Sequence, residues 1–254
     1  MFRTLSSCAV ALATLLAPVR APEDVASARE EHFVLTLPES DTEHRGAEVR
    51  GREIGLAVLR RRTVEGAEQA EWDLRFFGEE TRVSHVERWG GETSSLLWRE
   101  WRPRDGRTLR ASFGGAELEV QEWGGGARIR ETLDAGRGAL FPIAALELAR
   151  DGALPPGRVT LLDPLSRALE SATVEVCFGA QPLGDSAGAA VLERVHRLLR
   201  DDGTLASEWS FRGRELWSVR WQAGGLCAHR IRGEDWESRL PRCGRPRASE
   251  SERR

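Results

Sequence analysis

The feature that most restricts the fold is a hairpin-like pattern that occurs twice in the chain. The first copy runs from Phe113-Gly-Gly-Ala-Glu-Leu118 to Trp123, and the second runs from Phe211-Arg-Gly-Arg-Glu-Leu216 to Trp221. Each copy follows an Asp-Gly pair, which favours a turn between strands. Such a unit predicts antiparallel β-sheet, and two copies indicate two related halves. The alternative is a chance similarity between two glycine-bounded hairpins.

The two copies differ in phase by one residue. Val120 lies two residues after Leu118, whereas Val219 lies three residues after Leu216. One additional residue in one strand of a pair is what a β-bulge contributes. We therefore expect a bulge in one of the two hairpins.

Alternating apolar and polar residues, separated by glycine-rich turns, continue through most of the chain. Trp72, Leu74 and Phe76 share one side of a strand, and Asp73 and Arg75 share the other. The spacing leaves no room for the crossover helices of a parallel sheet. We expect a mainly β protein, an antiparallel curved sheet or half-barrel with one or two short helices. The expected strands cover residues 33–37, 53–62, 71–77, 81–88, 94–101, 107–113, 117–123, 127–133, 158–162, 172–178, 191–199, 205–211, 215–221 and 226–232.

One segment departs from the strand pattern. In residues 140–150, Ala144 and Leu148 fall on one helical face, Pro142 suits the first turn, and Gly152 suits the end of a helix. We expect a helix there, near the open side of the sheet.

The N-terminus has the pattern of a secretory signal peptide. Arg3 precedes an apolar run over residues 5–16, and cleavage is expected after Ala21. The apolar run is too short to span a bilayer, so we do not expect an integral membrane protein. We expect a periplasmic or secreted location, with residues 1–21 removed.

The remaining chain divides into three parts by composition. Residues 22–48 are expected to form a leader strand and a polar loop, and residues 49–232 the antiparallel β-domain. Charge and proline dominate residues 233–254, which we expect to be a disordered charged tail.

Charge restricts the partners. Removal of the signal peptide takes away Arg3 and Arg20 and changes the formal net charge from −3 to −5. This acidic balance argues against nucleic acid and against an anionic membrane surface. The chain has no Lys, Asn or Tyr, which a GC-rich coding sequence explains. The number of arginines by itself therefore does not indicate a recognition surface.

Three cysteines remain after residue 21. Cys177 and Cys227 both lie in expected strands and are our first candidates for a disulfide, which an oxidising compartment permits. Cys243 is then the odd thiol; three unpaired cysteines are the alternative. Cys227 and His229 share a strand face, but a single Cys-x-His without a second pair is a weak zinc signal, so we expect no metal site.

The chain carries no recognisable catalytic motif. Cys177, His196 and Asp201 have the chain order of a cysteine-based triad, but Cys177 lies within an expected strand rather than at a helix N-terminus. There is no Gly-x-Ser-x-Gly elbow or His-Glu-x-x-His helix, and a Gly-Lys phosphate loop cannot exist without lysine. His85 and His196 are expected to be structural. We expect no catalytic residues and no cofactor.

The nine tryptophans are the most distinctive side chains. On a curved sheet they can line a concave apolar groove that holds a ligand, or they can fill the core of a protein that lacks tyrosine. If a groove exists, the residues expected to line it are Trp98, Trp101, Trp123, Trp217 and Trp221.

Short motifs resemble a known group of domains. These are Val49-Arg-Gly-Arg-Glu-Ile-Gly55, Pro155-Pro-Gly-Arg-Val-Thr-Leu-Leu-Asp-Pro164, and the ending from Trp217 through Trp221 to Ile231. They are similar to exported bacterial β-domains of unknown function, including those that precede transglutaminase-like domains. Those domains look like relatives of the LolA/LolB half-barrel, a sheet curled around an apolar groove and plugged by helices. The resemblance covers residues 49–232 and implies a fold and a compartment, but no functional residue.

Three functions remain open at this point. The first is a non-catalytic exported envelope protein that binds a lipid or another apolar or amphipathic ligand in a concave sheet. The second is a structural or partner-docking module of the envelope without a small ligand, which a pseudo-symmetric two-sheet sandwich would favour. The third is a hydrolase whose site is not recognised.

Overall fold

The computed structural model describes residues 29–38, 51–90, 93–102, 105–136, 138–182, 190–221 and 225–243. The expected signal peptide at 1–21, the polar loop after residue 38 and the tail beyond residue 243 lie outside the described residues.

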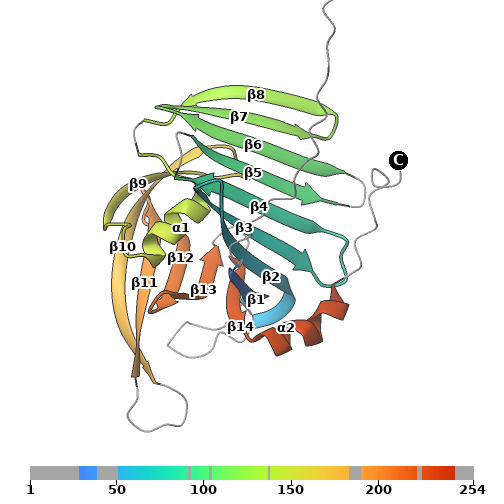
Figure 1. The fold of residues 1–254 in the computed structure, drawn as a ribbon, viewed down its shortest axis with the longest axis vertical. Coiled ribbons are helices and arrows are strands. Elements are labelled where there is room, and N and C mark those ends of the chain that lie inside the picture. The colour runs from blue at the N-terminus through green and yellow to red at the C-terminus, as the bar shows by residue number, and fades with distance from the viewer. Residues whose placement is uncertain are drawn as a thin grey trace, which may run out of the picture.

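All the strands of the described chain belong to one antiparallel sheet (Figure 1). The sheet is open and curved rather than closed into a barrel, as the residue pattern predicted, and a two-sheet sandwich is excluded. The strands are β1 (Arg29–Pro38), β2 (Gly51–Val64), β3 (Ala67–Phe76), β4 (Arg82–Trp89), β5 (Ser94–Trp101), β6 (Gly106–Gly114), β7 (Glu117–Gly124), β8 (Ala127–Asp134), β9 (Gly157–Leu162), β10 (Leu169–Pro182), β11 (Ala190–Arg200), β12 (Leu205–Arg212), β13 (Glu215–Trp221) and β14 (Cys227–Ile231).

Strand β1 joins two meanders into one sheet. Strands β2 to β8 follow one another on one side of β1, and β14 back to β9 follow on the other. His32 of β1 lies opposite Val58 of β2 and Ile231 of β14. The segment expected to be a leader strand is therefore central to the domain, which begins before residue 49.

Two short helices lie on opposite sides of the sheet. Helix α1 (Pro142–Arg150) lies within the curve, between the two meanders, and confirms the helix expected near 140–150 (Figure 1). Helix α2 (Gly233–Arg239), followed by the short helix η2 (Leu240–Arg242), lies against the other side. We call the sheet face turned toward α1 the inner face and the opposite face the outer face.

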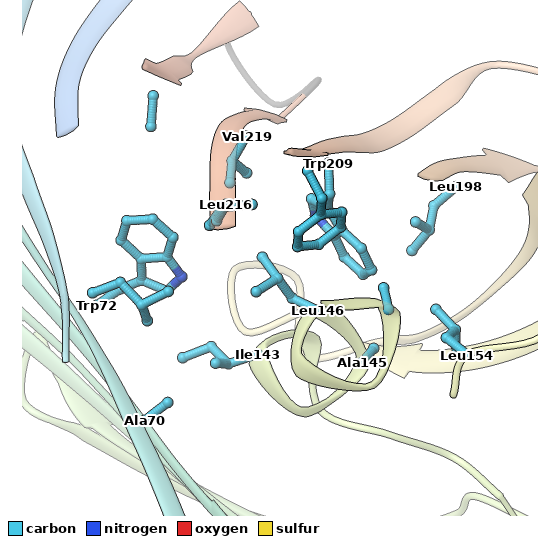
Figure 2. Close-up of a cluster of buried hydrophobic side chains, with 14 of the residues drawn as sticks. Ala70, Trp72, Ile143, Ala145, Leu146, Leu154, Leu198, Trp209, Leu216 and Val219 are labelled. Carbon is cyan, nitrogen blue, oxygen red and sulfur yellow. The ribbon is translucent and has the colours of Figure 1, made fainter. Parts of the chain in front are cut away.

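The main core fills the space between α1 and the inner face. Figure 2 shows Ile143 and Leu146 of α1 between Trp72 of β3 on one side and Trp209 of β12 on the other. The ring centroids of Phe33 and Trp72 are 5.1 Å apart. One helix thus buries aromatic residues from both meanders, which holds the two halves of the sheet together.

A second core cluster extends the first toward β5–β7. Trp98, Leu109 and Leu118 pack there against Phe141, the residue before α1. The rings of Phe113 and Phe141 have centroids 4.5 Å apart. The connection from β8 to α1 therefore covers the inner face of these strands.

The two copies of the sequence pattern form equivalent hairpins, β6–β7 and β12–β13. Phe113 lies opposite Leu118 in the first copy, and Phe211 lies opposite Leu216 in the second. The register of the second hairpin shifts between Ser210 and Phe211. The bulge expected in one copy is confirmed and lies in the second.

The expectation of a disordered tail from residue 233 is wrong for residues 233–243. Trp236 and Cys243 pack against Leu56 and Val58 on the outer face. Trp236, Leu240 and Cys243 have the i, i+4, i+7 spacing of one helical face, which the surrounding charges obscured.

We predict that Trp236→Ala releases this segment. Loss of the buried indole should lower the free energy of unfolding by about 3 kcal/mol and speed amide hydrogen exchange in residues 233–243, measured by urea unfolding and by exchange mass spectrometry. The matched control is Glu237→Ala, a change at the exposed neighbouring residue, which should leave hydrogen exchange unchanged. Unaltered protection in Trp236→Ala would contradict the packing role of this side chain.

Candidate functional site

The N-terminus of α1 is capped by a side chain from the sheet. Its N-cap residue, Phe141, offers no side-chain hydrogen bond. The carboxylate of Glu87 in β4, 0% exposed, instead accepts hydrogen bonds from the backbone N–H groups of Ile143 (2.9 Å) and Ala144 (2.7 Å). A carboxylate at this end satisfies free N–H groups and complements the positive end of the helix dipole.

A histidine accompanies this carboxylate. His85 lies two residues before Glu87 on β4, so both side chains project from the same face. The Nε2 atom of His85 is 2.7 Å from Oε1 of Glu87. A buried Glu87–His85 pair therefore lies under the N-terminal end of α1, and it supplies the hydrogen-bond acceptor that apolar side chains cannot.

A positively charged side chain contacts the C-terminus of α1. The guanidinium of Arg194 in β11 donates hydrogen bonds to the backbone oxygens of Ala149 (2.8 Å) and Arg150 (2.7 Å). A cation at the last carbonyls complements the negative end of the dipole.

A buried ion cluster lies at the same end. Arg150 is 2% exposed and donates two hydrogen bonds to Glu31 of β1, at 3.1 and 2.8 Å. Arg230 of β14 donates to the same carboxylate at 3.0 Å. Two-point guanidinium–carboxylate contacts are directional, so this cluster sets the position of α1 on the sheet.

Glu147 of α1 adds a second carboxylate to the cluster. It lies 3.2 Å from Nε of Arg150 and 3.6 Å from Arg61 of β2. Burial raises the pKa of the Glu147 carboxyl, and the two arginines oppose that shift without cancelling it.

A solvent-accessible cavity of about 440 Å³ borders this cluster. Its walls come from the charged side chains of β1, β2, β13 and β14, the turn before β13 and the end of α1, among them Arg61, Arg150, Arg214, Arg230 and Glu31. Arginines and carboxylates alternate around it, so it can hold a polar or charged group of a ligand.

The inner face continues past α1 as an uncovered apolar strip. Phe178 of β10 lies directly opposite Arg194 of β11, whose guanidinium reaches α1, so both project from the inner face. Leu192 projects from the same face two residues away. Phe178 and Leu192 are 66% and 62% exposed. Apolar surface therefore lies next to the charged C-terminal end of α1.

The five tryptophans expected to line a groove are divided between the faces. Trp98 and Trp221 project from the inner face and pack in the core, where the Trp221 ring meets Trp72 at 5.8 Å.

Trp101, Trp123 and Trp217 project from the outer face, and each lies under an arginine guanidinium. Trp98 and Trp101 of one strand differ by an odd number of residues, so alternation places them on opposite faces. The five side chains therefore do not line one groove.

The expected disulfide between Cys177 and Cys227 is not formed, and both cysteines are free. Strands β11, β12 and β13 lie between β10 and β14. Four strand spacings separate the two residues by roughly 19 Å, far beyond the 7 Å that a disulfide can bridge. Strand character was known from the residue pattern, but strand order was not.

The cysteine-triad order does not become a catalytic geometry. His196 lies opposite Val176, so the adjacent Cys177 projects from the other face of the sheet. Among the described residues, no three His, Cys, Asp or Glu side chains are grouped as a metal site requires.

In the described part of the chain, neither helix has the length and apolar character needed to cross a membrane.

The residues that hold α1 were missed by the sequence reasoning. Glu31 and Glu87 occupy inward positions in an alternating pattern, Glu31 before Phe33 and Leu35 and Glu87 after Val83 and His85. An acidic residue at an inward position was the available signal, because a buried carboxylate requires a partner.

Comparisons with protein-family models, with curated proteins and with solved structures found no match for this chain. The function therefore has to be inferred from the geometry of the site.

We predict that Glu87→Ala lowers the free energy of unfolding by about 3 kcal/mol, because two buried N–H groups lose their acceptor. Glu87→Gln keeps one acceptor oxygen and should lose only about 1 kcal/mol. Urea unfolding measures both. The matched control is Glu175→Ala on an exposed strand position, expected to change stability by less than about 0.5 kcal/mol. Equal losses in all three would contradict the capping role.

A second prediction concerns pH. Burial, reinforced by Arg194, lowers the pKa of His196 to about 4 from its usual value of 6.5. Between these pH values only the unfolded state takes up a proton on this side chain, so the folded state loses stability as the pH falls.

The His196→Leu variant has no imidazole to take up this proton in the unfolded state. Wild-type protein should therefore lose about 3 kcal/mol more than the variant as the pH is lowered through this window, measured by urea unfolding at a series of pH values. A parallel decline in both proteins would show that His196 is not buried in its neutral form.

Proposed function

We propose that this chain is a non-catalytic exported binding protein that holds an apolar or amphipathic ligand on the inner face of its curved sheet, as the resemblance to the LolA/LolB half-barrel implies. The observation that carries the proposal is how the inner face is closed. One nine-residue helix covers an aromatic floor and is held at both ends by buried charged groups.

The floor under α1 is suited to an acyl chain or a similar apolar group. The floor consists of aromatic side chains that project from the inner face of the sheet and are buried beneath α1: Phe33, Trp72, Trp209 and Phe211. When an apolar ligand displaces α1, the ligand makes the contacts with the floor that the apolar side chains of α1 made before. The apolar surface of the floor therefore stays out of water.

The charged contacts at the two ends of α1, made by Glu87 and by the Glu31–Arg150 pair, are called the charged clamps here, and they make such displacement feasible. A buried ion pair contributes little net stability relative to apolar packing, because desolvation offsets most of the attraction. When α1 moves, Glu87, Arg150 and Glu31 regain water. Contacts of this kind position the helix strongly while adding little to the cost of releasing it.

The open end of the inner face supplies an entrance for an amphipathic molecule. Phe178 and Leu192 offer exposed apolar surface, and the adjacent cavity offers the guanidiniums of Arg61 and Arg214. An apolar chain contacting the former and an anionic head group contacting the latter satisfies both surfaces at once.

A second candidate function is a partner-docking module of the envelope without a small ligand. The observation that favours it is the exposure of Trp101 and Trp217, 41% and 36%, on the outer face. Exposed tryptophans are common anchors of protein interfaces.

Mass spectrometry of the protein isolated gently from its native envelope, intact and after solvent extraction, separates the two candidates. A stoichiometric lipid in the extract is the result expected for a carrier. A protein that is empty and also fails to bind the fluorescent fatty acid cis-parinaric acid would exclude the carrier and leave the docking module.

We further predict that loosening the clamp strengthens binding. Glu87→Gln should raise the population with α1 displaced, and a change of about 1 kcal/mol improves the apparent affinity for cis-parinaric acid about fivefold. Fluorescence titration measures it, with Glu175→Gln as the control that should bind like wild type. Unchanged or weaker binding in Glu87→Gln would contradict displacement of α1.

A further inference from the structure

The outer face of β3–β7 contains a hollow that the proposed inner-face site does not use. Its volume is about 470 Å³, within the range of small-molecule sites. Side chains from five neighbouring strands line it, among them Gln69, Arg88, Arg110, Ser112, Glu119 and Gln121.

The lining is rich in hydrogen-bonding groups. Gln69 and Gln121 offer amides that both donate and accept, Ser112 offers a hydroxyl, and Arg88 and Arg110 offer guanidinium donors. Groups that donate and accept side by side match the hydroxyls of a sugar, which also do both. Leu97 adds a small apolar surface between them.

Three arginines on this part of the outer face have no acidic partner. Within the described residues, Arg99, Arg110 and Arg128 form no ion pair with a carboxylate. Arg88, which also lines the hollow, pairs with Glu65 at 3.0 Å, and Glu119 of the lining lies 3.6 Å from Arg130. Of the three, Arg110 lines the hollow, and Arg128 reaches its edge through Trp123. An unpaired guanidinium in the lining of a hollow, with a second at its edge, favours an anion.

Two of these guanidiniums are held in place by one indole. The guanidinium carbons of Arg110 and Arg128 lie 5.5 and 5.7 Å from the centroid of the Trp123 ring. Trp123 lies on the same strand and face as Gln121, which lines the hollow. Cation–π contacts limit the freedom of both side chains before a ligand arrives, which lowers the entropic cost of binding.

We propose that this outer-face hollow, lined by Arg110, Ser112 and Gln121 and with Trp123 beside it, binds an acidic oligosaccharide. Arg110 and Arg128 bind sugar carboxylates, and the amides and the hydroxyl bind ring hydroxyls. A nucleic acid fits less well, because the Trp123 ring already packs with two guanidiniums that a stacking base would have to displace.

Isothermal titration calorimetry with trigalacturonate and with neutral maltotriose tests the proposal on the whole chain. Trigalacturonate should bind, and maltotriose should bind at least about tenfold more weakly. Arg110→Gln should weaken trigalacturonate binding about tenfold or more. Arg220→Gln, the same change on the outer face of the other half of the sheet, should leave it unchanged.

A second variant separates binding from folding. Gln121→Glu adds a negative charge to the hollow without shortening the side chain and should also weaken trigalacturonate binding about tenfold, with an unchanged circular dichroism spectrum. No trigalacturonate binding, equal affinity for the two sugars, or equal losses in Arg110→Gln and Arg220→Gln would overturn the proposal. Tighter binding of a single-stranded oligonucleotide than of trigalacturonate at about 150 mM salt would also overturn it.

Discussion

The position of α1 between two buried charges is the interaction on which the rest of the structure depends. Glu87 meets the free N–H groups of its first turn, and Arg194 and the Glu31–Arg150 pair meet its last turn. These contacts come from β1, β4 and β11, which lie in different parts of the sheet. A single short helix therefore aligns both meanders, and the aromatic core closes around it.

Charged contacts and apolar contacts contribute differently to this arrangement. The apolar side chains of α1 supply most of the free energy of burial, because the aromatic and aliphatic residues beneath them accept such contacts without strict direction. The charged clamps contribute direction, since a carboxylate or guanidinium left without its partner in the core is costly. The proposed carrier function follows from this difference: an acyl chain can replace the apolar contacts, while the clamps define the position to which α1 returns.

The two faces of the sheet offer separate chemistry. Inward carboxylates and arginines are matched to one another around α1, whereas Arg99, Arg110 and Arg128 on the outer face have no acidic partner in the described chain. A ligand on the inner face has to move α1, but a sugar in the outer hollow does not. Binding at one face can therefore be measured without disturbing the other.

The residue pattern was enough to predict the strands, the antiparallel sheet, the helix near 140–150 and the bulge in one hairpin, because alternation and turn residues act between neighbours in the chain. It did not determine strand order. The folded chain places β1 between β2 and β14, separates Cys177 from Cys227, and brings Glu87 to the N-terminus of α1. A period of two residues tells which side chains share a face, but contacts between distant segments depend on how the whole sheet curves and closes its core.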